Sequence, residues 1–277
     1  MQTAVGIFRE TLHSPEREFD DLEILRLTGR RLSEQGLNVI LKKPEEVLQD
    51  GLPEDAQPDI FFVMCEQVKI LSVLEAWEKK GATLVNRIEG ILNTYRHRMT
   101  PLLKDAKVSM PKSDLVSTSK PVQGVQGIWV KRGDVHNTQK GDVFFAKTEN
   151  EVNDSLKSFH SRGISQAVLQ EHVPGDLVKF YGIGDPSGEG SFWFKWFYHK
   201  NQDLKKYPFS EESLKALTRA AARSLGLEVF GGDAIIAADG RMVLIDLNAW
   251  PSFALFRDEA SLAISGCLLS KLKTPAR

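Results

Sequence analysis

Residues 233–248 read DAIIAADGRMVLIDLN, two apolar-rich runs on either side of an Asp-Gly pair. Asp-Gly between such runs is a strong signal for a tight two-residue β-turn, because both residues tolerate positive φ. If Asp239 and Gly240 form that loop, Ala238 pairs with Arg241 on the returning strand. The stretch is therefore predicted to be a β-hairpin.

The register of this hairpin brings two acidic residues face to face. Counting outward from the turn, Asp233 lies opposite Asp246, and Gly231 lies opposite Asn248. Strand side chains alternate between faces, so Asn248 points to the same side as Asp246. Like charges directly opposed across a strand pair repel. Two carboxylates and an amide oxygen on one face suit a hard divalent cation such as Mg²⁺, which often bridges to nucleotide phosphates.

The other face of the hairpin is expected to pack in the core. A second interpretation, in which the hairpin has no functional role, stays open. The expected core side chains are Ala234, Ile236, Val243, Ile245 and Leu247. In the alternative interpretation the hairpin is solvated and its acids simply face water. A β-bulge would also break the expected pairing, because it shifts one strand against the other.

The composition argues against several classes of protein. The chain has 277 residues, with 36 Lys plus Arg, 37 Asp plus Glu and a net charge of −1. This balance gives no electrostatic footprint for nucleic acid or for a membrane surface, so neither partner is expected. No apolar run approaches the roughly 18 residues of a spanning helix, and no signal peptide is recognised. Cys65 and Cys267 are far apart, which fits a reducing, cytoplasmic location.

The hydrophobic pattern changes along the chain. Up to about residue 95, apolar strands alternate with amphipathic helices, which predicts a parallel α/β sheet. The expected strands are 3–8, 37–42, 58–64 and 82–86, and the expected helices are 19–36 and 68–81. From residue 96 onward the order is strand-rich with interspersed helices, which predicts α+β units. The fold class is therefore α/β plus α+β.

Several polar residues outside the hairpin are candidates for a phosphate or base site. Lys131 ends the predicted strand GIWVK, from which an ammonium can reach a phosphate, although a lone lysine there is more often a surface residue. His136 lies in the polar loop that follows, where an ordinary loop histidine is the commoner interpretation. Gln170, Glu171 and the backbone near Val173 follow a strand and could form the edge of a flat pocket.

The run SFWFKWFYH, residues 191–199, is predicted to be a strand with aromatic side chains on both faces. Alternation places Lys195 and His199 on one face with Trp193 and Phe197. A lysine amid so much aromatic surface is costly unless it has an anionic partner. Lys195 is therefore a candidate for binding an anion.

Taken together, these segments resemble the ATP-grasp superfamily over essentially the whole chain. The approach segment ATLVNRIEGILNTYRHRMTPLLKDAKVSMPKS is similar to that of the ribosomal-protein glutamate ligases, and DLNAWPS to the family's acid-x-Asn-x-x-Pro ending. The resemblance implies an N-terminal parallel α/β domain over 1–95, a central lobe over 96–173 and a C-terminal lobe over 174–277, with ATP held between the two α+β lobes.

The resemblance also implies roles for individual residues. Arg98 would stand where the first ATP-contacting lysine usually lies, and Lys131 matches the second. The implied adenine contacts are Gln170, Glu171 and Val173. The implied ligands of Mg²⁺, or of Mn²⁺ in its place, are Asp233, Asp246 and Asn248.

Three activities are compatible with these matches. The first is a ligase that activates a carboxylate of a small molecule or peptide as an acyl phosphate and joins it to an amine. The second is a small-molecule kinase, because the Lys131–His136 spacing and the place of Lys179 are similar to inositol trisphosphate kinases. If the chain is such a kinase, the candidates for binding the anionic groups of the acceptor are Lys179, Lys195, His199 and Arg257. The third is a nucleotide-binding protein without turnover.

Overall fold

The computed structural model describes residues 1–15, 17–52, 58–135, 138–186, 188 and 191–272. Its described strands form three four-stranded sheets, one parallel and two antiparallel. The chain is thus α/β plus α+β, as the hydrophobic pattern predicts. No described helix combines the length and the apolar character that crossing a membrane requires.

The N-terminal sheet has the order β2-β1-β3-β4, and all its strands are parallel. Its central strands β1 and β3 are wholly buried apolar runs, as expected when helices cover both faces. Two short helices, α2 and α4, are added to the elements expected from the sequence. The strands are β1 (Thr3–Ile7), β2 (Asn38–Lys42), β3 (Ile60–Val63) and β4 (Thr83–Val85); the helices are η1 (Thr11–His13), α1 (Glu18–Glu34), α2 (Pro44–Asp50), α3 (Val68–Lys79) and α4 (Ile88–Asn93).

The central lobe is an antiparallel sheet of order β5-β8-β6-β7 covered by α6. The Thr148–Glu151 capping box starts α6. The edge strand β5 reads SDLVS, too polar to be recognised in the sequence. The elements are α5 (Arg96–Asp105), β5 (Ser113–Ser117), β6 (Ile128–Arg132), β7 (Val143–Ala146), α6 (Glu149–Ser161) and β8 (Gln166–Glu171).

The C-terminal sheet is antiparallel, with the order β10-β9-β11-β12. Ser210 caps α7 by accepting a hydrogen bond from the backbone of Ser213 at 3.2 Å. The aromatic strand β10 has the predicted alternation, since Phe194 and Trp196 pack on one core and Trp193 and Phe197 on another. The elements are β9 (Asp176–Ile183), β10 (Trp193–Tyr198), α7 (Glu211–Leu225), β11 (Val229–Ile236), β12 (Met242–Ala249) and α8 (Arg257–Lys271).

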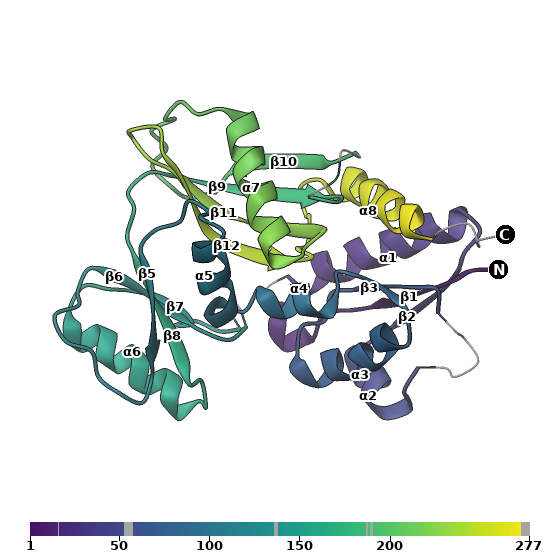
Figure 1. Ribbon diagram of the computed structural model, residues 1–277, viewed down its shortest axis with the longest axis horizontal. Coiled ribbons are helices and arrows are strands. Elements are labelled where there is room, and N and C mark those ends of the chain that lie inside the picture. Colours follow the sequence, from purple (N-terminus) through teal and green to yellow (C-terminus); the bar gives the residue numbers. More distant parts are fainter. Residues whose placement is uncertain (16, 53–57, 136–137, 187, 189–190, 273–277) are drawn as a thin grey trace.

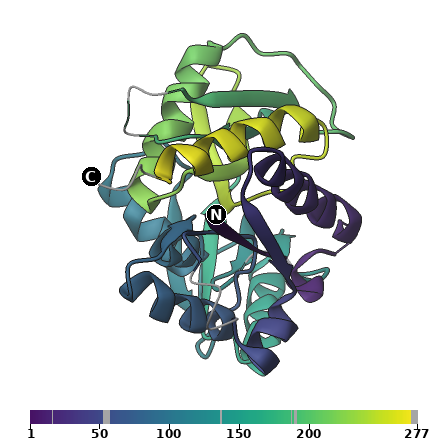
Figure 2. The same cartoon turned by 90° about the vertical axis from the view of Figure 1, so that its right-hand side faces the viewer.

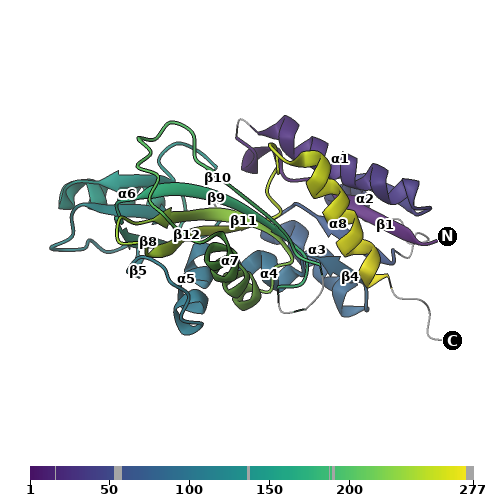
Figure 3. The same ribbon diagram turned by 90° about the horizontal axis from the view of Figure 1, so that it is seen from above.

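The N-terminal and C-terminal sheets are joined into one body, here called the N–C body. Two apolar clusters each take buried side chains from both sheets, and α1 packs along α8 (Figures 1 and 3). Asn86, fully buried, accepts hydrogen bonds from the amides of Glu228 and Val229 and donates one to the carbonyl of Val229.

The central lobe, by contrast, has a small apolar core of its own. The buried members of that core all come from β6, β7, α6, β8 and the turn before β8. Figures 1 and 3 show this lobe at the opposite end of the molecule from β1, and Figure 2 shows α1 and α8 covering the near end. We propose 1–95, 96–173 and 174–277 as domain limits, since each range holds one sheet.

The β11–β12 hairpin has the acid pair expected from the sequence but reaches it differently. Asp233 lies opposite Asp246, and Gly231 opposite Asn248. The expected two-residue turn is wrong, because the amide of Ala237 donates to the carbonyl of Arg241 at 2.9 Å. The loop therefore spans residues 238–240 and ends on Gly240 at φ 81°, where a glycine has no steric penalty.

This longer loop shifts the pairing by one residue, and a bulge restores it. Ala234 lies opposite Leu244, and the register shifts between Asp233 and Ala234. Ile245 is the extra residue on β12, and it lines a cavity instead of the core. Leu244 takes the core position that was expected for Ile245. The expected core face is thus right for Ala234, Ile236 and Leu247 and wrong for Ile245, while Val243 is buried but lies outside that cluster.

Candidate functional site

Two cavities meet at the acid pair. The inter-lobe cavity, about 220 Å³, lies between the central lobe and the C-terminal sheet. The N-terminal cavity, about 320 Å³, lies between the loop after β1 and side chains of β9, β11 and β12. Both are lined by Arg96, Asp233 and Asp246. A larger cavity of about 780 Å³ lies beside α8 and is lined by none of the residues predicted from the sequence to be catalytic or binding residues.

Each carboxylate of the acid pair forms an ion pair with a basic side chain. Lys179 Nζ lies 2.7 Å from Asp233 Oδ1, because β9 places Lys179 directly across from Asp233. Arg96 Nη2 lies 2.6 Å from Asp246 Oδ2, reaching over from the first turn of α5. These two ion pairs offset the repulsion expected between directly opposed acids. The pair is therefore a mixed-charge cluster, with Asn248 beside it in the N-terminal cavity.

The donor chemistry of this cluster fits a hard divalent cation. Asp233, Asp246 and Asn248 supply two carboxylates and an amide oxygen, the ligand types that Mg²⁺ and Mn²⁺ prefer. Across the described part of the chain, no three His, Cys, Asp or Glu side chains gather into a metal cluster. A metal here would therefore depend on the amide of Asn248, on water and on phosphate oxygens.

Lys131 forms part of the wall of the inter-lobe cavity. It is only 4% exposed, and its ammonium donates to the carbonyl of Ile245 at 3.2 Å. Burial lowers the pKa of Lys131 to about 8; the nearby Asp246 opposes this shift and Arg96 adds to it. The position excludes the surface-lysine interpretation.

The far end of the inter-lobe cavity is a flat slot formed where β8 ends. Gln170, Glu171 and Val173 line it, with Trp129 and His172 beside them. The Gln170 amide donates to Ser113 Oγ at 3.2 Å, which fixes this edge. The apolar walls of the slot are Val143, Leu177, Ile235 and Ile245. A slot with apolar walls and a polar edge can hold an aromatic base.

The expected place of Arg98 is wrong. Its side chain is 34% exposed and pairs with Glu89 at 3.7 Å, in a separate surface hollow. Arg96, two residues earlier, lines both cavities and is only 3% exposed. Residues two apart on a helix point to different sides, so only one of these arginines can face the site.

Three residues expected to bind substrate lie outside both cavities. Lys195 pairs with Glu259 at 3.0 Å and lies over the ring of Phe256, so the anionic partner it requires comes from the protein itself. Arg257 pairs with Asp20. His199 lies just past β10, the edge strand farthest from β12. The sequence shows alternation along β10 but not which strand borders the site.

The loop after β6 is described only in part. His136 lies outside the described residues. Asp142, which closes this loop, is fully buried and accepts hydrogen bonds from Arg132, Arg162 and the amide of Thr138. Its pKa falls to about 2, because these bonds outweigh the effect of burial. The loop is thus anchored at its base by a buried carboxylate.

Residues of the N-terminal sheet complete the site and were not foreseen. Arg9, His13 and Arg17 follow β1 and line the N-terminal cavity. The carboxyl ends of parallel strands are where ligands bind in α/β sheets, which was the available signal. The sequence FRETLHSPER, residues 8–17, carries several charges directly after a buried strand, the pattern that could have identified this loop.

Comparison with solved structures shows the fold. The ATP-grasp ligase PsnB complexed with a minimal precursor has a TM-score of 0.65 and 17% identity, covering 98% of this chain and 99% of that one. D-alanine–D-alanine ligase from Bacillus anthracis complexed with ATP has a TM-score of 0.68 and 13% identity, covering 98% and 95%. VanG D-Ala:D-Ser ligase from Enterococcus faecalis has a TM-score of 0.67 and 12% identity, covering 98% of this chain and 99% of that one. No family model and no curated protein matches the sequence.

Proposed function

We propose that this chain, which has the ATP-grasp fold, is a Mg·ATP-dependent ligase that joins a carboxylate to an amine through an acyl phosphate. One observation carries the proposal: the inter-lobe and N-terminal cavities share the Asp233–Asp246 wall. A nucleotide in one cavity would present its terminal phosphate to an acceptor in the other. The similar structures quoted above are all ligases, which does not favour the kinase alternative.

The residues on the nucleotide side take separate roles in this proposal. The base lies in the slot at Gln170, Glu171 and Val173, and the Lys131 ammonium offsets charge that develops toward the leaving ADP. Mg²⁺ held by Asp233, Asp246 and Asn248 would supply electrostatic stabilisation of the phosphates. Arg96 takes the role that was first given to Arg98.

The acceptor side carries basic residues beside the acids Asp21, Asp233 and Asp246. Arg9, Arg17 and Lys179 line the N-terminal cavity with Arg96, and such groups attract a carboxylate. The carboxylate oxygen attacks the γ-phosphorus, ADP leaves, and the acyl phosphate forms. An amine then attacks the acyl carbon and inorganic phosphate leaves. The PsnB structures contain a precursor, so the proposed acceptor is a small molecule or a peptide. The proposed location is the cytoplasm, as the two well-separated cysteines suggest.

The test follows the γ-phosphate of labelled ATP. The chain is incubated with Mg²⁺ and either a pool of amino acids and short acidic peptides or a pool of inositol and sugar phosphates. The proposal expects free phosphate and ADP, only with the first pool. Label retained on an organic product with the second pool would overturn it in favour of the kinase. Binding of ATP without release of phosphate in either pool would indicate a protein without turnover.

A further inference from the structure

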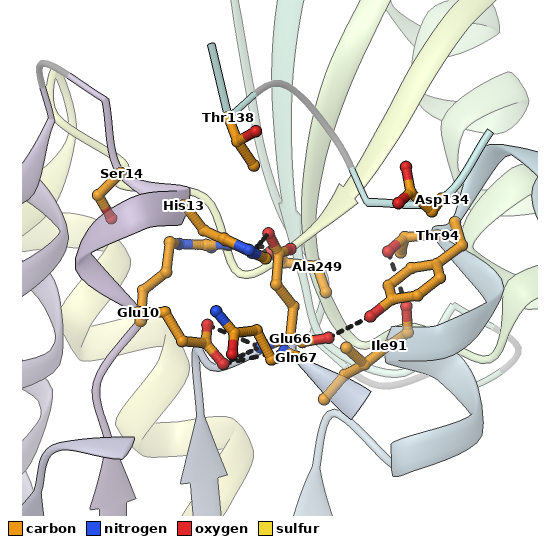
Figure 4. A network of polar contacts seen from close by, with 12 residues as sticks. Glu10, His13, Ser14, Glu66, Gln67, Ile91, Thr94, Asp134, Thr138 and Ala249 are labelled. Atoms are coloured by element: carbon orange, nitrogen blue, oxygen red, sulfur yellow. Dashed lines mark hydrogen bonds and ion pairs between the residues drawn. The ribbon is translucent and has the colours of Figure 1, made fainter. Parts of the chain in front are cut away.

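The loop after β1 holds a histidine paired with a glutamate at the edge of the N-terminal cavity. His13 Nδ1 lies 2.6 Å from Glu66 Oε1, and the imidazole is only 9% exposed. The two residues follow β1 and β3, which are neighbours in the parallel sheet, so their loops meet at the same edge. Figure 4 shows the two side chains pointing toward each other from these loops.

The surroundings of Glu66 fix the tautomer of His13. Arg9 Nη1 lies 3.2 Å from Glu66 Oε2, and Arg9 Nη2 donates to the carbonyl of Trp250 at 2.6 Å. A carboxylate beside this buried guanidinium is ionised and can only accept hydrogen bonds. The proton between His13 and Glu66 is therefore assigned to Nδ1, so that in the neutral imidazole Nε2 carries the lone pair.

The second ring nitrogen remains available to a ligand. No hydrogen bond joins Nε2 to any residue in the described ranges 1–15, 17–52, 58–135, 138–186, 188 and 191–272. His13 lines the same cavity as Lys179, Asp246 and Asn248. The backbone that carries it is fixed, because Glu10 accepts from the amides of Glu66 and Gln67. An oriented imidazole with a free lone pair in a substrate cavity has the geometry of a general base.

We infer that His13 is the general base of the second half-reaction, with Glu66 as its positioning residue; this rests on the proposed ligase function. The amine nitrogen forms a bond to the acyl carbon, and the bond from that carbon to the phosphate oxygen breaks. Inorganic phosphate leaves with the bonding pair. The proton released from nitrogen passes to His13 Nε2 and then to water. The first half-reaction, attack of a carboxylate on phosphorus, transfers no proton and does not need His13.

The test separates the two half-reactions with hydroxylamine. With Mg·ATP and the pool of amino acids and short acidic peptides, hydroxylamine intercepts an acyl phosphate as a hydroxamate. It is largely unprotonated at neutral pH and attacks without a base. His13→Gln is expected to keep hydroxamate formation within about twofold and to lose amide formation about 100-fold. Imidazole added to His13→Ala should restore part of the amide formation. His160→Gln, on the exposed end of α6, is the matched control and should change neither rate.

Two results would contradict the inference. Equal loss of both products in folded His13→Gln would make the residue structural, and unchanged amide formation would remove it from the reaction. Absence of hydroxamate with the unaltered chain would instead overturn the proposed ligase function, on which the inference rests. Circular dichroism of each variant separates loss of activity from loss of fold.

Discussion

The central lobe and the N–C body both line the inter-lobe cavity, yet they are stabilised differently. The N–C body has two apolar clusters, each drawing on two sheets and the helices between them. The central lobe has one small cluster of its own. The cations and acids of the acid pair belong to the N–C body and α5, whereas the base slot belongs mainly to the central lobe. In our proposal the N–C body therefore carries the acid pair on the larger apolar core, and the central lobe carries most of the base slot on a smaller one.

The largest expected effect comes from the platform. Asp246→Asn keeps the size of the side chain but removes a charge from the acid pair, and we expect kcat to fall on the order of 10³-fold. Gln170→Ala, on the central lobe, should instead raise the KM for ATP about tenfold and leave kcat nearly unchanged. Steady-state kinetics of both variants make the comparison.

Asp239→Asn is the control for Asp246→Asn. It lies on the same hairpin, is exposed and pairs only with Arg241 among the described residues. Its activity should equal that of the unaltered chain. If Asp246→Asn and Asp239→Asn were equally active, the acid pair would have no role in turnover.

The joint between the two sheets of the N–C body is the next target. Asn86→Ala removes the partner of the Glu228 and Val229 amides and one of the two donors to the Val229 carbonyl, which also accepts from the Trp250 amide. We expect a loss of about 3 kcal/mol in the free energy of unfolding. Asn153 makes a similar bridge inside the central lobe, accepting from the amide of Val122 and donating to its carbonyl. Asn153→Ala, only partly buried, should cost about 1 kcal/mol. Urea unfolding measures both.

A third prediction compares the lobes without substitutions. The free energy of the opening that exposes an amide hydrogen to exchange should be on the order of 2 kcal/mol lower in β6 and β8 than in β9 and β11. This difference corresponds to roughly the apolar area of one buried side chain. Native-state hydrogen exchange measures each set. Equal opening free energies would mean that the central lobe is as firmly held as the rest.

The smallest expected effect is a pH dependence of nucleotide use. Lys131 is charged below a pKa of about 8 and neutral above it. Since its cation faces the phosphates in our proposal, kcat/KM for ATP should fall with rising pH, about tenfold by pH 9, because this ratio reports the free enzyme. Lys131→Arg, which stays charged, should lose this fall. A fall of the same size in that variant would assign it to another group.

The sequence predicted the chemistry of the hairpin better than its geometry. Asp233 and Asp246 do face each other, but a longer turn and a bulge at Ile245 cancel one another. Glycine in an Asp-Gly pair serves a two-residue or a three-residue loop, and nothing local decides between them. The expected face of Ile245 was wrong for that reason, while Leu247, beyond the bulge, was right.

The site could be predicted where it depends on strand alternation and not where it depends on packing between units. Lys131 and Gln170 line one cavity because they lie on the same face of two adjacent antiparallel strands, where Gln170 is opposite Trp129, two residues before Lys131. Arg96 could not be preferred to Arg98, since the direction of α5 depends on contacts far along the chain. Lys195 was assigned to substrate because its partner Glu259 lies on a helix that the sequence pattern did not predict.

The most direct test of the account follows oxygen from the carboxylate. The amino acids and short acidic peptides are labelled with ¹⁸O in their carboxyl groups and incubated with the chain and Mg·ATP. An acyl phosphate predicts one ¹⁸O transferred to inorganic phosphate for every amide bond formed, with ADP as the nucleotide product. Unlabelled phosphate, or AMP with pyrophosphate, would contradict the account.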